Sequence, residues 1–178
     1  PLIEGADTVI FLDAIHLGHC PERVMPGHTI EELRRNDRVV GGRRPQDAAL
    51  ARAIYEGFVL GRIHETDLLT AETVKVVENT FRDVNIAFAN EFAVLCEDLG
   101  IDAYRAIELA NCHPRVNILN PGPGVGGHCI AVDPYFIIDA APQSTRLMSS
   151  ARRINSDRPY AVVKDIEALL EPGKTQTI

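Results

Sequence analysis

The residues best suited to do chemistry lie in a glycine-rich stretch, residues 122–135, which reads GPGVGGHCIAVDPY. Its reactive side chain is Cys129, and the thiolate form of a cysteine is the nucleophile. His128 beside it would favour that charged form. Glycines allow positive φ and close approach of a ligand to the backbone, while prolines stiffen a loop. The residues of these two kinds are Gly122, Gly124, Gly126, Gly127, Pro121 and Pro123. The pattern predicts a nucleophilic thiol in an anion-binding loop; a tight structural turn with an unreactive cysteine is the alternative.

A dinucleotide-binding fingerprint is another interpretation of these glycines, because they spell G-x-G-x-x-G. That fingerprint follows a buried strand, opens a helix and precedes an acidic residue about 20 positions later. Here Ile130, Val132 and Pro134 follow directly, and we expect them to oppose a helix. The loop is therefore not predicted to bind a dinucleotide in that way.

A second group of polar residues lies on a predicted helix. No Pro or Gly interrupts residues 67–99, and Gly100 then supplies a stop, which predicts a helix about 50 Å long. Its polar row, at spacings of three and four, is Lys75, Asn79, Arg82, Ile86 and Asn90. Such a row is usually solvated, yet Lys, Asn and Arg without a carboxylate could be donors to one anionic ligand. Both interpretations stay open.

The same helix carries an apolar stripe at the same spacings. Its members are Val74, Val77, Phe81, Val84, Phe88, Phe92, Leu95 and Leu99. A helix this long exceeds what one small domain can cover. We therefore expect the stripe to form the interface of a homodimer.

Shorter elements surround this helix. The first third predicts a strand at residues 7–14, a proline-bounded loop at 20–27, a helix at 28–35, a strand at 38–42 and a helix at 45–58. In the loop, Glu22 and Arg23 are either solvated or face a site. Beyond Gly100 we expect a helix over 101–109, a loop over 111–119 and a long helix over 144–170, kinked at Pro159.

Composition excludes several classes of protein. The chain has 178 residues, 46% of them apolar, which is typical of a globular protein. A net charge of -7 argues against a nucleic-acid partner, and we find no membrane span or signal peptide. The four cysteines are too widely spaced for a disulfide framework; they are Cys20, Cys96, Cys112 and Cys129. We expect a cytoplasmic protein.

Four separated segments, in this order, resemble the UDP-glucose/GDP-mannose dehydrogenase family. They read CPERVMPG, NDRVVGG, AETVKVVENTFRDVNIAFANE and HPRVNILNPGPGVGGHCIAVDPYF. The resemblance covers nearly the whole chain. It implies oxidation of the C6 alcohol of a nucleotide sugar to a carboxylate, a four-electron reaction that uses NAD.

The resemblance also implies a mainly α fold, with a long-helix central dimerisation domain and a small α/β remnant of a Rossmann domain at the N-terminus. We expect residues 1–62 to be the last part of the NAD-binding domain, 63–158 the central catalytic and dimerisation domain, and 159–178 a linker toward a nucleotide-sugar-binding domain. Because we find no credible fingerprint, this chain alone is not expected to bind NAD well.

Position by position, the resemblance makes Cys129 the nucleophile that forms a thiohemiacetal and then a thioester. It makes Lys75 the donor to the oxyanion, with Asn79 one turn later. Glu22 and Asp133 match carboxylates that activate water or transfer protons. Further positions resemble substrate contacts: Arg23, Val24, Arg82, His113, Arg115 and Gly126. The loop with Arg115 is expected to reach the partner subunit's site.

One position departs from many UDP-glucose enzymes, which have a lysine where this chain has Val132. With His128 before the cysteine, the pattern resembles the branch that oxidises N-acetylhexosamine nucleotides. UDP-N-acetylmannosamine is the favoured substrate, with UDP-glucose and UDP-N-acetylglucosamine as alternatives.

Two other functions compete with this one. The first is a helical dimerisation module with no activity by itself, since hydride transfer needs a bound nicotinamide. The second is a metal site built from clustered histidines and cysteines. Its candidate ligands are His16, His19, Cys20, Cys112, His113, His128 and Cys129. We expect no metal, because the spacing of a zinc pair is missing.

Overall fold

The computed structural model describes residues 15–170. The predicted strand at residues 7–14 lies outside them. The chain divides into two compact units, Pro1–Lys75 and Val76–Ile178. We describe each unit by itself.

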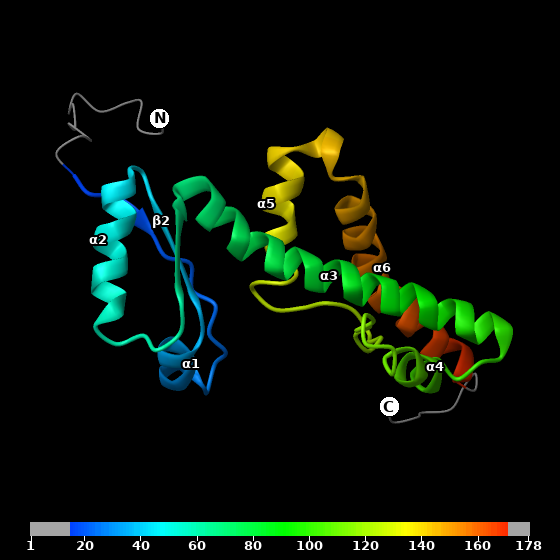
Figure 1. The fold of residues 1–178 in the computed structure, drawn as a ribbon. Helices are drawn as coiled ribbons and strands as arrows, with labels where there is room; N and C mark the ends of the chain where they lie inside the picture. The colour runs from blue at the N-terminus through cyan, green and yellow to red at the C-terminus, as the bar shows by residue number, and fades with distance from the viewer. Residues whose placement is uncertain (1–14, 171–178) are drawn as a thin grey trace. The chain divides into compact units, whose positions relative to one another are not determined.

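The first unit contains a small sheet and two helices (Figure 1). Its three strands are β1 (Gly18–His19), β2 (Arg38–Gly42) and β3 (Ile63–Asp67), in the order β1-β2-β3. β1 pairs antiparallel with β2, and β2 pairs parallel with β3 through the crossover helix α2 (Pro45–Glu56). α1 (Thr29–Arg35) precedes β2. The unit is therefore a small α/β arrangement, as predicted.

A buried carboxylate fixes the start of α2. Asp47 is 2% exposed and accepts hydrogen bonds from Nε and Nη2 of Arg44, at 3.1 and 2.9 Å, and one from His16 at 2.7 Å. It also accepts from the backbone N–H of Arg44 at 3.1 Å, which satisfies an orphan donor at the helix end. The Arg44 hydrogen bonds lower the pKa of Asp47 far below its usual range, against the opposing effect of burial.

The second unit is helical. α3 (Leu68–Leu99) begins in the first unit and continues through this one, and α4 (Ala103–Ala110) follows it. Between them Gly100 has a φ of +69°, the left-handed conformation typical of a helix stop. After a long loop come α5 (Asp133–Ala140), a short 3₁₀ turn (Pro142–Ser144) and α6 (Arg146–Leu169). The predicted helices at 28–35, 45–58, 67–99, 101–109 and 144–170 are thus confirmed to within a few residues.

Two sequence predictions need correction. Pro134 was expected to oppose a helix, but it lies in the first turn of α5, where the missing N–H costs no intrahelical hydrogen bond. The strands β1 and β3 were not predicted. β1 has only two residues, and the sequence IHETD of β3 is half-exposed and polar, so neither gives a clear apolar signal.

The two faces of α3 differ in exposure within the second unit. The apolar stripe is exposed at Val77, Phe81, Phe88, Leu95 and Leu99, by 41 to 67%. The opposite face is buried and polar: Asn79, Asp83 and Asn90 are 7, 0 and 1% exposed. The polar row is therefore not solvated at these positions.

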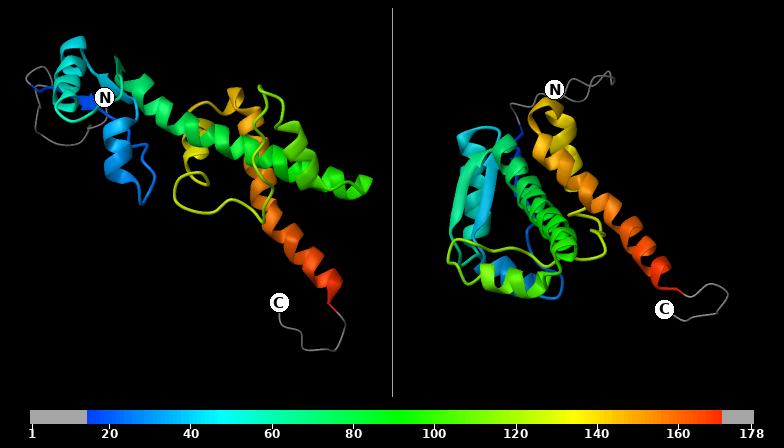
Figure 2. Two further views of the ribbon diagram at one scale, coloured as in Figure 1. Left: turned by 60° about the horizontal axis from the view of Figure 1, so that its bottom comes forward. Right: turned by 90° about the vertical axis from the view of Figure 1, so that its right-hand side faces the viewer.

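Hydrogen bonds join the polar face of α3 to α6, which crosses it (Figure 2). Asn155 of α6 donates to the carboxylate of Asp83 at 2.8 Å, and Arg152 forms an ion pair with the same carboxylate. Burial raises the pKa of Asp83, and these two partners oppose that rise. Pro159 lies inside α6, as predicted, and an interior proline costs a helix about 3 kcal/mol. No helix within residues 15–170 is long and apolar enough to cross a membrane.

Candidate active site

Cys129 lies in the long loop between α4 and α5 and is exposed. Its carbonyl oxygen accepts from the N–H groups of Val132 and Asp133, at 3.0 and 2.8 Å. These bonds form a turn that leads directly into α5. The turn fixes the cysteine four residues before the helix and leaves its thiol accessible.

Asp133 is the first residue of α5 and connects this turn to α3. Its carboxylate accepts a hydrogen bond of 2.6 Å from Nδ2 of Asn79, across 54 residues of sequence. The structure thereby brings together two of the predicted catalytic residues, beside the backbone of a third. Because an amide NH₂ has two donors, Asn79 keeps one N–H for another acceptor.

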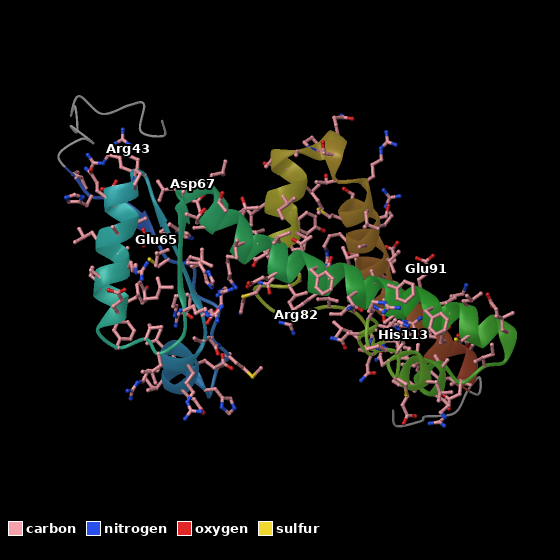
Figure 3. All side chains as sticks on the ribbon, viewed as in Figure 1. Arg43, Glu65, Asp67, Arg82, Glu91 and His113 are labelled. Atoms are coloured by element: carbon pink, nitrogen blue, oxygen red, sulfur yellow. The ribbon has the colours of Figure 1, made fainter. Side chains whose placement is uncertain are left out.

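Lys75 and Arg82 lie on the same helix as Asn79. Lys75 is half-buried and comes one turn before Asn79. Arg82 comes three residues after Asn79 and is exposed (Figure 3). Residues three and four apart on a helix are neighbours, so the three side chains share one side of α3. The proposed contact between Lys75 and the thiol stays a prediction.

Glu22 lies in the first unit, in the loop between β1 and α1. Its Oε1 atom accepts from the N–H groups of Arg23 and Val24, at 2.7 and 2.8 Å. The guanidinium of Arg38 lies 3.6 Å from the same oxygen. Arg23 in turn donates to the carbonyl of Asp37 at 2.6 Å. The predicted site residues of this loop thus share one hydrogen-bonded turn.

Three further predicted contacts are exposed in the second unit. His113 follows α4 and accepts at Nδ1 a hydrogen bond of 3.3 Å from the N–H of Arg115 (Figure 3). Nη2 of Arg115 lies 3.4 Å from Nε2 of the same ring. Gly126 is also exposed, and a Cβ added to it would meet nothing within 4 Å. His113, Arg115 and Gly126 are therefore accessible to a ligand or to another chain.

The sequence alone indicated no role for two residues that bind segments of the candidate site. Arg38 is 3% exposed, contacts Glu22 and lies with its guanidinium carbon 5.8 Å from the centre of the Tyr55 ring. Asn90 was recognised only as a member of the polar row, yet it binds the backbone of Gly122. A polar residue at helical spacing from Lys75 and Asn79 was the available signal.

No group of three or more His, Cys, Asp or Glu side chains suited to a metal ion occurs within residues 15–170. The proposed cluster of histidines and cysteines is therefore not assembled there. The thiols of all four cysteines are free.

Comparison with known proteins identifies the family. Residues 69–157 match the model of the UDP-glucose/GDP-mannose dehydrogenase family, central domain. Residues 3–59 match the NAD binding domain of the same family. The two matches cover the long helix, the cysteine loop and the α/β unit.

Individual dehydrogenases also match the chain. The chain is 55% identical, over 153 residues, to an NDP-N-acetyl-D-galactosaminuronic acid dehydrogenase of Ralstonia nicotianae, covering 86% of this chain and 36% of the relative. It is 54% identical, over 157 residues, to a UDP-N-acetyl-D-mannosamine dehydrogenase of Methanocaldococcus jannaschii, covering 88% and 36%. A solved structure of UDP-D-ManNAc dehydrogenase from Pyrococcus horikoshii superposes with a TM-score of 0.82 and 52% identity, covering 86% and 37%.

The chain thus spans little more than a third of the length of these relatives. Two relatives with different sugar names match it almost equally, so identity alone does not choose a substrate. Fold, motifs and both domain matches nevertheless agree on one group of proteins. The chain belongs to the UDP-glucose/GDP-mannose dehydrogenase family.

Proposed function

We propose that this chain supplies the cysteine, the donors and the dimer interface of an enzyme that oxidises a nucleotide sugar at C6 to the uronic acid. The observation that carries the proposal is the 2.6 Å hydrogen bond from Asn79 to Asp133, whose N–H also binds the carbonyl of Cys129. The backbone of the cysteine, an amide donor and a carboxylate are therefore joined by hydrogen bonds. The side chains of these three residues are the groups that aldehyde oxidation through a thioester requires.

In the proposed reaction the Cys129 thiolate adds to the carbon of the C6 aldehyde. A C–S bond forms, and the carbonyl π electrons move to oxygen. Lys75 and the free N–H of Asn79 donate to that oxyanion, as preorganised donors do in other acyl-transfer sites. Loss of a hydride from the thiohemiacetal then gives a thioester on Cys129.

Water completes the reaction by attacking the thioester carbon. Glu22 or Asp133 accepts the proton of the water, the C–S bond breaks and the thiolate leaves. Arg23, Val24, Arg82, His113, Arg115 and Gly126 are the proposed substrate contacts. Exposed Arg82 and Arg115 suit the diphosphate of a nucleotide sugar, because guanidinium groups bind phosphate oxygens in a bidentate manner.

The four electrons would leave the substrate as two hydrides, the first in forming the aldehyde from the C6 alcohol and the second in forming the thioester, and two molecules of NAD would accept one hydride each. Within residues 15–170, the strand-to-helix turn from β2 to α2 reads GGRRP and lacks the G-x-G-x-x-G spacing that cradles a pyrophosphate. We therefore assign no described residue to the cofactor. NAD dependence is proposed from the match of residues 3–59.

We favour UDP-N-acetylmannosamine as the substrate, because Val132 and His128 follow the N-acetylhexosamine pattern and several relatives, 51 to 54% identical, are named UDP-N-acetyl-D-mannosamine dehydrogenases. The proposed domains are residues 1–62 for the NAD-binding part, 63–158 for the central part and 159–178 for a linker. The proposed partner is a second copy of the chain, joined through the exposed stripe of α3. A reducing cytoplasm would keep the thiol free.

The experiment that tests this proposal is Cys129→Ser in the whole protein, supplied with NAD and UDP-N-acetylmannosamine. We expect no uronic acid, because an alkoxide is a poor leaving group and the hydroxyl a weaker nucleophile. Product analysis by mass spectrometry checks it, with Cys112→Ser as the matched control at an exposed thiol near the start of the same loop. Acid formation by Cys129→Ser at the control's rate would remove Cys129 from the mechanism.

A further inference from the structure

The segment of the loop that carries Cys129, residues 122–132, is held at its start by a buried amide of α3. Asn90 is 1% exposed, and its Oδ1 atom accepts a hydrogen bond of 2.8 Å from the N–H of Gly122. Its Nδ2 atom donates to Oδ1 of Asn155 at 2.9 Å. One side chain therefore joins the loop to both long helices.

The same segment is also held from α6. Nε of Arg158 donates to the carbonyl of Gly122 at 3.3 Å, so both backbone groups of that glycine are bound by side chains. Gly124, two residues later, has a φ of +137°, and a Cβ added there would lie 2.8 Å from Cγ of Pro159. Gly122 is therefore held by hydrogen bonds, and Gly124 by close packing against α6.

Beyond Gly124 the segment is open around its two remaining glycines. A Cβ added to Gly126 or Gly127 would meet nothing within 4 Å. The next anchor is Asp133, which receives the hydrogen bond from Asn79. Cys129 thus lies in an open segment between two anchors.

Both anchors lie on one face of α3. Asn79 and Asn90 are separated by three helical turns, or about 16 Å along the axis, so they point in nearly the same direction. The loop residues that they bind are equally far apart in sequence and could extend to roughly twice that distance. The loop must therefore arch away from α3 between the anchors, with Cys129 in the arch.

We infer that Asn90 is a positioning residue for the reaction: through Gly122 it sets the place of the arch, and hence of the Cys129 thiol relative to the donors on α3. The inference rests on the proposed function. It goes beyond a role in stability, because the amide binds the backbone of the reactive loop directly. Misplacing a reacting group by about 1 Å can cost a rate on the order of 10²-fold.

The test compares three variants of the whole protein. Asn90→Ala loses both hydrogen bonds. Asn90→Asp keeps an acceptor for Gly122 but loses the donor to Asn155 and places a carboxylate near Asp83. Asn85→Ala is the matched control, since this amide on the same helix also makes two hydrogen bonds, to the backbone of Asn117 and Leu119, farther from Cys129.

We expect Asn90→Ala to lower kcat by about 10- to 100-fold with little change in KM. Asn90→Asp should recover most of that loss although it destabilises the fold, and Asn85→Ala should keep a kcat within a few-fold of the wild type. Equal losses of kcat in Asn90→Ala and Asn85→Ala would overturn the inference. So would a lower kcat in Asn90→Asp than in Asn90→Ala, since a purely structural network predicts that order.

A second readout does not depend on the dehydrogenase activity. The alkylation rate of Cys129 by iodoacetamide, followed by mass spectrometry, should change in Asn90→Ala and return toward the wild-type value in Asn90→Asp. If the protein oxidises no nucleotide sugar and this pattern still appears, the proposed function fails while the positioning role stands. An unchanged alkylation rate in folded Asn90→Ala contradicts the positioning role itself.

Discussion

At the scale of residues, one hydrogen bond, from Asn79 to Asp133, connects the polar face of α3 to the turn that carries Cys129. Cys129, Asn79 and Asp133 could be singled out because a thiol in a glycine loop, an amide on a polar row and a nearby acid each have an evident chemical use. The hydrogen bond from Asn79 to Asp133 was not predictable, because it joins residues 54 positions apart and depends on the packing of α5. Asn90 was given no role because its partners, Gly122 and Asn155, are brought to it only by the packing of the loop and of α6.

Lys75 and Arg82 offer a test of the donor row. We expect Lys75→Ala to lower kcat and kcat/KM together by on the order of 10²-fold, because an oxyanion donor acts mainly in the transition state. Arg82→Ala should mainly raise KM, as a diphosphate contact would. Steady-state kinetics on the whole protein separates the two, and a Lys75→Ala variant with only a raised KM would contradict its role.

Asp47 makes the first unit sensitive to acid. Its hydrogen bonds from Arg44 lower its folded-state pKa below that of the unfolded chain, so the charged form stabilises the fold above about pH 4, and this contribution is lost as the pH falls toward the folded-state pKa. Asp47→Asn should therefore reduce the free energy of unfolding near pH 7, with the difference shrinking below about pH 4. Urea unfolding at several pH values measures it.

Exposed Asp98 is the control for that experiment, and Asp98→Asn should change the stability little at any of these pH values. A constant difference between Asp47→Asn and the wild type from neutral pH to about pH 3 would show that shape, and not charge, is what Asp47 contributes.

At the scale of elements, the long helices were predictable because uninterrupted apolar periodicity and glycine stops are strong signals. The buried face of α3 was harder to predict. Hydrophobic periodicity usually identifies the interior, but here the apolar stripe is exposed and the buried face pairs Asn79, Asp83 and Asn90 with partners on α5, α6 and the loop. A sequence shows which residues share a face, and only the packing shows which face is covered.

The exposed stripe leads to a prediction about assembly. We expect the chain to be a dimer at micromolar concentration, and Phe88→Asp to make it monomeric, because Phe88 is 55% exposed at the middle of the stripe and stacks on Phe92. Val94→Asp is the control, as Val94 is 43% exposed but lies off the stripe. Light scattering distinguishes the states; a wild-type monomer at that concentration would refute the prediction.

At the scale of the whole molecule, residues 15–170 carry the groups of the proposed chemistry but no recognisable cradle for the cofactor. We expect calorimetry to show little or no NAD binding to this chain and clear binding to the whole protein. Similar NAD affinities of this chain and of the whole protein would mean that residues outside the fingerprint bind the nicotinamide. That result would require a new assignment of the cofactor site.

The exposed stripe of α3 also makes the stability of the proposed dimer depend on the protein concentration. In the proposed dimer this surface leaves water only on association, so its stabilising effect follows mass action: a tenfold fall in concentration weakens the dimer against its unfolded chains by about 1.4 kcal/mol. The amount of protein present then becomes one of the determinants of its melting temperature. At low concentration the chain is therefore more easily unfolded than at high concentration, although every contact within it is the same.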